Sequence, residues 1–327
     1  MAKAKVFPAS PTLVPTNYIA ADLNISRAHV YHMAETLDDF PKPVFIGSHR
    51  KYVLQDYERF RRNYIAKHQG RAKRGHGFMP LGRTCVLNAD GGQGKTYLAL
   101  QLEVAMRAKI PFLGLPVKQG PVLFFSAEEP LQILRYRIEA ICLAEGLKAC
   151  DLSGLHVLDH SRDVAWLFEE DRRTGQLRET ERFRWLCELV ETIQPAALVL
   201  DNRARIFRGN QNDSGLATEV IAILDRLAAR HDMSILLLSH PSLSGISSGR
   251  GDSGSVAWSN AARARMYLHQ PGEDARSGPD DGKRVLTSMK SSHGQQGKSV
   301  NLQWQNGRFY CDYQPPKADA GTLSDGS

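Results

Sequence analysis

The sequence predicts an α/β fold with a mostly parallel sheet, preceded by a smaller unit. Three observations predict this class. Short β-rich runs alternate with longer helical patterns between residues 78 and 313, as they do in βαβ units. These runs ("TCVLNA", "PVLFFS", "LHVLD", "ALVLD", "SILLLS") are largely apolar, which is typical of strands covered on both faces. A glycine-rich loop follows the first run and leads directly into an amphipathic helix.

Five segments follow one another along the chain. Residues 1–15 contain three prolines and no periodicity, so we expect disorder there. Residues 16–67 form a compact unit, and residues 68–77 ("HQGRAKRGHG") form a basic linker that cannot bury a core. Residues 78–313 form the α/β core. The tail, residues 314–327, is expected to be disordered.

The composition is that of a soluble globular protein, with 42% apolar and 24% charged residues. The net charge is +7, and residues 1–75 account for all of it, with 13 Lys and Arg against 6 Asp and Glu. A concentrated basic segment attracts the phosphate backbone of nucleic acids. The alternative is a solvated basic tail.

Membrane and disulfide-dependent classes are not expected. The longest apolar runs, such as "ILLL", are too short to cross a bilayer, and the N-terminus lacks the apolar segment of a signal peptide. The five cysteines form no CxxC pair, which indicates reduced thiols in the cytoplasm and neither a disulfide framework nor a zinc site. They are Cys85, Cys142, Cys150, Cys187 and Cys311.

In the first compact unit, "YIAADL" predicts a short helix, and "NI" predicts a turn before a second helix, "RAHVYHMAE". The stretch "PKPVFIGSHRKYV" alternates around Gly47-Ser48 as a β-hairpin does, and "LQDYERFRRNYI" predicts a third helix. This order resembles the small winged helix-turn-helix domains of the AlpA and excisionase type.

That resemblance implies a duplex DNA-binding unit, with the second helix in the major groove and the hairpin on the backbone. Ser26 is the expected N-cap of the second helix. The side chains expected to face bases are those of Arg27, His29, Val30 and Tyr31. The side chains expected to hold phosphates are those of Ser26, Arg50 and Lys51. The alternative is a winged unit that docks another protein.

The stretch "LNADGGQGKTYLAL", residues 87–100, has the strand–loop–helix context of a phosphate-binding loop. Its backbone N–H groups can hold phosphates, helped by the helix N-terminus. Lys95 is expected to reach the β- and γ-phosphates of ATP, and Thr96 to bind Mg²⁺. Ala89 stands where such loops usually carry their first glycine, and it fits if its φ stays negative. The expected nucleotide-binding residues are Ala89, Asp90, Gly91, Gly92, Gln93, Gly94, Lys95, Thr96 and Tyr97.

Ionisable residues follow three later β-rich runs. Glu128 and Glu129 come after "PVLFFS", and either carboxylate can activate a water while the other caps the next helix. Asp201 ends "ALVLD" and is expected to complete the shell of Mg²⁺ and water. His240 follows "SILLLS" and is expected to sense the γ-phosphate. The alternative for His240 is a packed or capping histidine.

The order of "ADGGQGKT", "SAEEP", "LVLD", "LLLSH" and "GSVAWSNAARARMYL" resembles the RecA-fold ATPases of the RepA-type hexameric helicases. These are plasmid and phage replication proteins related to DnaB-type helicases. The resemblance covers residues 78–313. It implies a RecA-like P-loop NTPase core, ATP and Mg²⁺ as ligands, and a homo-oligomer, expected to be a hexamer.

The resemblance also implies residue roles. Glu128 corresponds to the catalytic base, and Asp201 and His240 to the strand-end pair. Arg263 corresponds to an arginine finger that reaches the nucleotide of a neighbouring subunit, with Arg265 as a second candidate. The implied catalytic set is Lys95, Glu128, Arg137, His240, Arg263 and Arg265. The stretch "TSMKSSHGQQG" matches a strand-and-turn of the family, in which Lys290 is implied to bind nucleotide beside the finger. The sequence departs from the family at Asn202, where Thr or Pro is common.

Two Gly-containing loops, residues 203–215 and 241–254, follow the strands that end in Asp201 and His240. In RecA-type folds these positions face the ring channel and contact single-stranded DNA. Flexible backbone and cationic side chains suit such contacts. The expected phosphate contacts are Arg203, Arg205 and Arg208. The alternative is a pair of ordinary surface loops.

These features together predict a DNA-dependent ATPase that moves on single-stranded DNA and is anchored on duplex DNA by its first unit. One alternative is a site-specific DNA-binding regulator or replication initiator that uses ATP only as an assembly switch. A third is a recombinase-like filament former.

Overall fold

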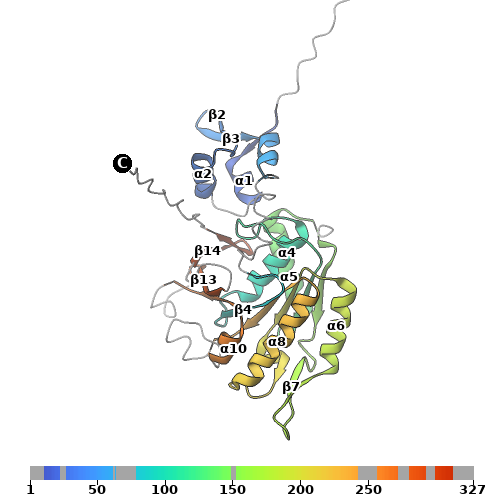
Figure 1. Ribbon diagram of the computed structural model, residues 1–327. Helices are drawn as coiled ribbons and strands as arrows, with labels where there is room; N and C mark the ends of the chain where they lie inside the picture. The colour runs from blue at the N-terminus through green and yellow to red at the C-terminus, as the bar shows by residue number, and fades with distance from the viewer. Residues whose placement is uncertain are drawn as a thin grey trace, which may run out of the picture.

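A computed structural model describes residues 11–22, 27–61, 63, 79–148, 152–241, 256–271, 280–291 and 299–311 (Figure 1). The expected linker at 68–77 and the expected tail at 314–327 lie outside these residues. Within the described part of the chain, no helix is both long enough and apolar enough to pass through a membrane.

The core is a nine-stranded sheet in the order β15-β14-β13-β12-β4-β11-β9-β5-β6. The six neighbouring strands from β12 to β6 in this order run parallel to one another. The other three, β13, β14 and β15, pair antiparallel at the opposite side of the sheet. The parallel strands are β4 (Thr84–Ala89), β5 (Val122–Ser126), β6 (Leu155–Asp159), β9 (Ala197–Asp201), β11 (Ser234–Ser239) and β12 (Ala264–His269). The antiparallel strands are β13 (Lys283–Ser291), β14 (Ser299–Gln305) and β15 (Arg308–Cys311). The predicted α/β class with a mostly parallel sheet is confirmed.

Helices cover both faces of this sheet, which explains why its strands are apolar at nearly every position. Consecutive strand residues point to opposite faces. Val86 of β4 therefore packs into one core cluster, while its neighbour Leu87 packs into the other. The face of Leu87 is covered by α4 (Lys95–Ala108) and α5 (Leu131–Glu145). The face of Val86 is covered by α6 (Glu181–Ile193), α8 (Ser214–Arg230) and α10 (Val256–Ala261).

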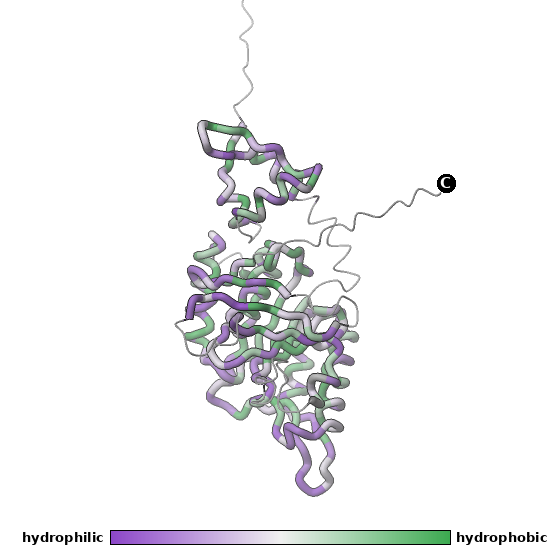
Figure 2. Tube along the Cα trace, turned by 90° about the vertical axis from the view of Figure 1, so that its left-hand side faces the viewer, coloured by the Kyte–Doolittle hydropathy of each residue, from purple (hydrophilic) through white to green (hydrophobic). Residues whose placement is uncertain are grey.

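A second, three-stranded sheet lies beside the core sheet. It consists of β7 (Phe168–Glu170), β8 (Leu177–Glu179) and β10 (Phe207–Arg208). The turn between β7 and β8 projects at the lower end of Figure 1, and Figure 2 shows it as mainly hydrophilic. β10 follows α7 (Arg203–Ile206), so the stretch expected to be a loop at 203–215 is largely ordered. Most of the second expected loop, 241–254, lies outside the described residues.

The N-terminal unit contains β1 (Leu13–Pro15), α1 (Thr16–Asp22), α2 (Arg27–Thr36), β2 (Val44–Ile46), β3 (His49–Val53) and a helix over residues 54–61. Its small core includes Ile19, Val30, Met33, Tyr52 and Phe60. Disorder was expected for residues 1–15, but residues 13–15 form β1. The reason is that β1 pairs with the hairpin strand β3 and buries Val14.

Candidate nucleotide-binding and hydrolysis site

The glycine-rich loop joins the end of β4 to the start of α4. Gly92 and Gly94 have φ values of +77° and +93°, which favour glycine over other residues. Ala89, by contrast, is the last residue of β4, is fully buried and has no positive φ. Ala89 therefore stands in place of the usual first glycine at a position with ordinary strand geometry. Its φ is not positive, which is the condition under which alanine was expected to fit.

Lys95 and Thr96 are the first two residues of α4, and both are buried. The Lys95 Nζ lies 3.0 Å from His240 Nε2. The Thr96 hydroxyl donates a 3.0 Å hydrogen bond to Asp201 Oδ2. The parallel strands β9 and β11 bring Asp201 and His240 to the same sheet edge as the loop, because the carboxyl ends of parallel strands share one edge.

The two adjacent glutamates after β5 have different partners. Glu128 Oε1 lies 3.7 Å from His240 Nε2, and Glu128 Oε2 accepts a hydrogen bond from the Asn202 amide. Glu129 Oε1 instead pairs with Arg137 Nη2 at 2.6 Å. Glu128 therefore lies near Lys95 of the loop and His240 after β11, whereas Glu129 is held by Arg137 of α5.

The environments of the exposed Glu128 and the buried Asp201 shift the pKa values of their carboxyl groups in opposite directions. The hydrogen bond with His240 is the main cause that lowers the pKa of Glu128 to about 2, and Lys95 and Asn202 add to it. Burial raises the pKa of Asp201 to about 6, although Lys95 and Thr96 partly offset this. Glu128 is thus fully ionised near neutral pH, and Asp201 is close to its titration range.

Thr96 and Asp201 fit a magnesium ion bound together with nucleotide phosphates. Both supply oxygen atoms, which Mg²⁺ prefers. Asp201 Oδ1 is buried and has no hydrogen-bond partner among the described residues. That part of the chain contains no cluster of three or more His, Cys, Asp or Glu side chains suited to a metal. The remaining ligands would therefore be phosphate oxygens and water, as is usual for Mg²⁺.

Asn202 contributes to the site, although the sequence marks it only as a departure from the Thr or Pro that is common at this position of the family. Its side-chain amide donates to Glu128, and its Oδ1 accepts from the Arg205 backbone N–H at 3.3 Å. The Asp201–Asn202 peptide is cis. The sequence signal that could have identified Asn202 as a site residue is its position directly after Asp201 at the end of a strand.

Arg137 and Tyr97 lie next to each other beside the loop. The Arg137 guanidinium is 4.9 Å from the centroid of the Tyr97 ring and also pairs with Glu129. Tyr97 in turn packs edge-on against Trp304 of β14 at 4.4 Å. The implied catalytic residue Arg137 thus reaches the second glutamate of the pair.

The implied finger residues gather at a different place. Arg265 pairs in register with Lys290 of β13 on one side and with Val86 of β4 on the other. Arg263 lies just before β12, and both arginines and burial lower the pKa of Lys290, burial being the larger cause. Ala264 lies level with Cys85, so Arg263 lies level with Thr84, which is five residues before Ala89. At about 3.3 Å per residue, the backbone of Arg263 is therefore about 16 Å from the level of Ala89. These cations therefore lie together, away from the phosphate loop of their own chain.

The three arginines expected to contact single-stranded DNA have different environments. Arg203 is only 6% exposed, donates through Nε to Ser239 Oγ at 3.0 Å and packs over the Trp258 ring. Burial lowers its pKa to about 10. The prediction that Arg203 contacts DNA disagrees with this burial, because its guanidinium supports the core. Arg205 and Arg208 are exposed.

In the N-terminal unit, Arg27, Tyr31, Arg50 and Lys51 line one groove between α2 and the β2–β3 hairpin. The Arg50 guanidinium lies 4.8 Å from the centroid of the Tyr31 ring. Val30 was expected to face bases, but it is fully buried because it belongs to the small core of the unit. Ser26 and the side chain of His29 lie outside the described part of the structure.

One comparison with known proteins bears on this geometry. A family model described as an AAA domain matches residues 49–245, which is more than half of the chain. The match includes the glycine-rich loop and the strand-end residues Glu128, Asp201 and His240. It ends before β12, so Arg263, Arg265 and Lys290 lie beyond it. The chain therefore belongs to the AAA domain family of P-loop ATPases.

Proposed function

We propose that this protein is a DNA-dependent ATPase of the RepA-like helicase type, which hydrolyses ATP at the interfaces of a homo-oligomeric ring. In this proposal the N-terminal unit anchors the protein on duplex DNA, and the core moves along single-stranded DNA. ATP and Mg²⁺ are the ligands of the core.

The groups on one chain suit the nucleotide half of the reaction. Lys95 would neutralise the β- and γ-phosphates, and Thr96 and Asp201 would hold Mg²⁺. Glu128 is ionised and oriented by Asn202, so it can accept a proton from, or orient, the attacking water. His240 lies between Lys95 and Glu128 and is placed to respond to the γ-phosphate.

One structural relationship carries the proposal of an interface site. Arg263 lies level with the start of β4, whereas the phosphate loop of the same chain follows the end of that strand. Arg265 and Lys290 lie level with Val86, near the middle of β4. A cationic cluster that serves a nucleotide from there must serve one held by another subunit. A contact between one surface of a subunit and a different surface of its neighbour is a head-to-tail contact. Repeated head-to-tail contacts produce a ring when the rotation from one subunit to the next adds up to a full turn. An arginine supplied in this way would stabilise the charge that develops on the transferred phosphoryl group.

Two surfaces suit DNA. Arg205 and Arg208 are exposed and follow Asp201 closely in the chain, at the sheet edge that also holds the nucleotide site. The Arg208 guanidinium lies 4.2 Å from the centroid of the Trp166 ring, which provides an aromatic surface of the kind that stacks bases. Arg27, Arg50 and Lys51 give the groove of the N-terminal unit a positive charge that suits duplex phosphates.

The test combines three measurements on the full chain. We expect ATP hydrolysis to rise many-fold with single-stranded DNA, a forked duplex to be unwound, and a ring to form with ATP. If ATP changes only the oligomer size and the affinity for duplex DNA, the protein is instead a regulator or initiator that uses ATP as an assembly switch. Open-ended growth on DNA, seen by electron microscopy, would indicate a filament former.

A further inference from the structure

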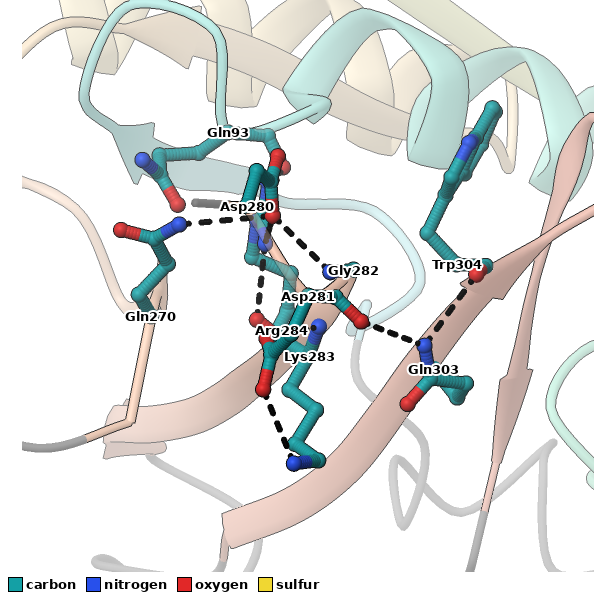
Figure 3. A network of polar contacts seen from close by, with 9 residues as sticks. All are labelled: Gln93, Gln270, Asp280, Asp281, Gly282, Lys283, Arg284, Gln303 and Trp304. Atoms are coloured by element: carbon teal, nitrogen blue, oxygen red, sulfur yellow. Dashed lines mark hydrogen bonds and ion pairs between the residues drawn. The ribbon is translucent and has the colours of Figure 1, made fainter. Parts of the chain in front are cut away.

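A buried arginine from the antiparallel part of the sheet contacts the phosphate loop (Figure 3). Arg284 lies on β13, is 4% exposed and donates through Nε to the backbone carbonyl of Gln93 at 3.2 Å. Its two terminal nitrogens hold both oxygens of Asp280, at 2.8 and 2.7 Å. Asp280 also accepts from the Gly282 backbone N–H at 2.9 Å, so the carboxylate that orients the guanidinium is itself fixed.

This contact fixes one peptide plane of the loop. The Gln93–Gly94 peptide is not among the cis bonds, and in a trans peptide the carbonyl and the following N–H point in opposite directions. When Arg284 holds the Gln93 carbonyl, the Gly94 N–H must therefore point away from Arg284. Backbone N–H groups of such loops are the groups that bind phosphate.

The loop needs an outside partner to keep this orientation. Gly92 and Gly94 flank Gln93, and glycine lets a peptide plane rotate at low steric cost. Gly94 is also confined on one side, since a Cβ on it would lie 2.7 Å from Cζ of Phe309. The Phe309 backbone is held by Gln101 of α4 through two hydrogen bonds of 2.9 Å each. The antiparallel strands β13 and β15 thus brace the loop from two sides.

We propose that Arg284 is a positioning residue for the nucleotide, which turns the Gly94 N–H toward the phosphates by holding the Gln93 carbonyl. The inference rests on the proposed nucleotide site and adds a residue beyond the AAA match. The two members of the pair differ in exposure, since the Arg284 side chain is 4% exposed and contacts the loop, whereas the Asp280 side chain is 56% exposed. Arg284 and Asp280 therefore act as a pair, one holding the loop and the other orienting the guanidinium.

The neighbouring residues provide a matched control in the same turn. Lys283 pairs with Asp281 at 2.8 Å, next to the Arg284–Asp280 pair, but both side chains are more than half exposed. Figure 3 shows the two pairs side by side. Arg284→Met and Asp280→Asn disturb the loop contact, whereas Lys283→Met and Asp281→Asn remove similar charges without touching the loop.

The experiment measures binding of a fluorescent ATP analogue, steady-state kinetics and the thermal midpoint for the full-length variants. We expect Arg284→Met to weaken analogue binding about tenfold, and Asp280→Asn to weaken it by a smaller factor. KM for ATP should rise while kcat changes little, because the contact orients the ground state. Arg284→Lys should recover part of the affinity, and both control variants should bind within about twofold of wild type.

Equal analogue affinity in Arg284→Met and Lys283→Met, at unchanged thermal midpoints, would overturn the inference. If Arg284→Met unfolds, Arg284→Lys and Asp280→Asn decide the matter, since wild-type affinity in both also overturns it. Failure of the wild-type protein to bind the analogue would refute the nucleotide site itself, which is a separate result.

Discussion

The Thr96 hydroxyl donates a 3.0 Å hydrogen bond to Asp201 Oδ2 across 105 residues of sequence. This bond joins the first turn of α4 to the end of β9. It satisfies only one carboxylate oxygen, because Asp201 Oδ1 is buried without a partner among the described residues. The protein therefore keeps a buried, partly unsatisfied carboxylate at the point where Mg²⁺ would bind.

Asp201→Asn should stabilise the metal-free protein while abolishing Mg²⁺-dependent hydrolysis. The folded pKa of Asp201 is raised from 3.8 to about 6, so unfolding releases a proton between these values and stability falls as pH rises through them. At pH 7.5 the neutral amide avoids a penalty on the order of 3 kcal/mol. Thermal unfolding in EDTA at pH 7.5 and pH 4.5 checks this. A variant less stable than wild type at pH 7.5 would contradict it.

Glu128→Gln and Glu129→Gln should separate the roles of the two adjacent glutamates. Glu128→Gln removes the ionised group beside His240 and should lower kcat by about 10²-fold or more, with nucleotide binding retained. Glu129→Gln breaks the pair with Arg137 and should change kcat far less. Single-turnover hydrolysis and analogue binding give both quantities. A larger loss of kcat in Glu129→Gln would reverse the assignment.

The sequence predicted the five β-rich runs because continuous apolar stretches mark buried parallel strands. It did not identify β12, β14 and β15 as strands, since "ARARMYLH" carries two arginines in its first four residues and the last strands alternate in polarity. The antiparallel strands nevertheless contact the phosphate loop. Arg284 meets Gln93 across 191 residues and Gln101 meets Phe309 across 208 residues, and no local pattern encodes contacts of that separation.

The candidate site was predictable where residue type and strand ends decide it. Lys95, Thr96, Asp201 and His240 come together because parallel strands end at one sheet edge. Adjacent positions could not be resolved in the same way, because only tertiary partners separate the two glutamates. Glu128 contacts His240 and Asn202, whereas Glu129 pairs with Arg137 of α5. Burial was also hidden, since nothing local distinguishes the buried Arg203 from the exposed Arg205.

Arg205→Ala and Arg208→Ala should weaken single-stranded DNA binding and leave the fold intact, because both side chains are exposed. Arg203→Ala should instead destabilise the core by about 1–3 kcal/mol, since it removes the contacts with Ser239 and Trp258. Fluorescence anisotropy with labelled oligonucleotides and thermal unfolding separate the two effects. Reduced DNA affinity in a stable Arg203→Ala protein would restore its predicted DNA role.

Glu103→Gln should stabilise the protein more as pH rises. Glu103 of α4 is fully buried, and neither carboxylate oxygen has a hydrogen-bond partner among the described residues. Burial raises its pKa well above the ordinary value of 4.5 for a glutamate carboxyl. Unfolding therefore releases a proton above pH 4.5, and the free energy of unfolding falls as pH rises toward the folded pKa.

The gain in thermal midpoint for Glu103→Gln should be larger at pH 8 than at pH 5, because the cost of ionising the buried carboxyl in the folded protein grows between these two pH values. Glu139→Gln, at an exposed position of α5, controls for the loss of one negative charge. A gain independent of pH would show that the Glu103 carboxyl is not the cause.

The variants Lys95→Ala and Arg263→Ala should each be inactive alone but should hydrolyse ATP when they assemble into one mixed ring. Lys95→Ala removes the phosphate lysine, and Arg263→Ala removes the finger that is proposed to serve the next subunit. In a mixed ring, an Arg263→Ala subunit still offers an intact loop, and a Lys95→Ala neighbour still offers its arginine. With equal, random incorporation, roughly a quarter of the head-to-tail interfaces are then complete.

The control mixes Lys95→Ala with Glu128→Gln, whose defects lie on the same half of the interface. No interface in that mixture has both an intact lysine and an intact glutamate, so hydrolysis should stay absent. Steady-state ATPase of co-purified, differently tagged variants with single-stranded DNA measures both mixtures. Recovery with Arg265→Ala but not with Arg263→Ala would move the finger to Arg265. Absence of recovery with either arginine variant would mean that the site is completed within one chain, because the two sheet ends then never meet across subunits.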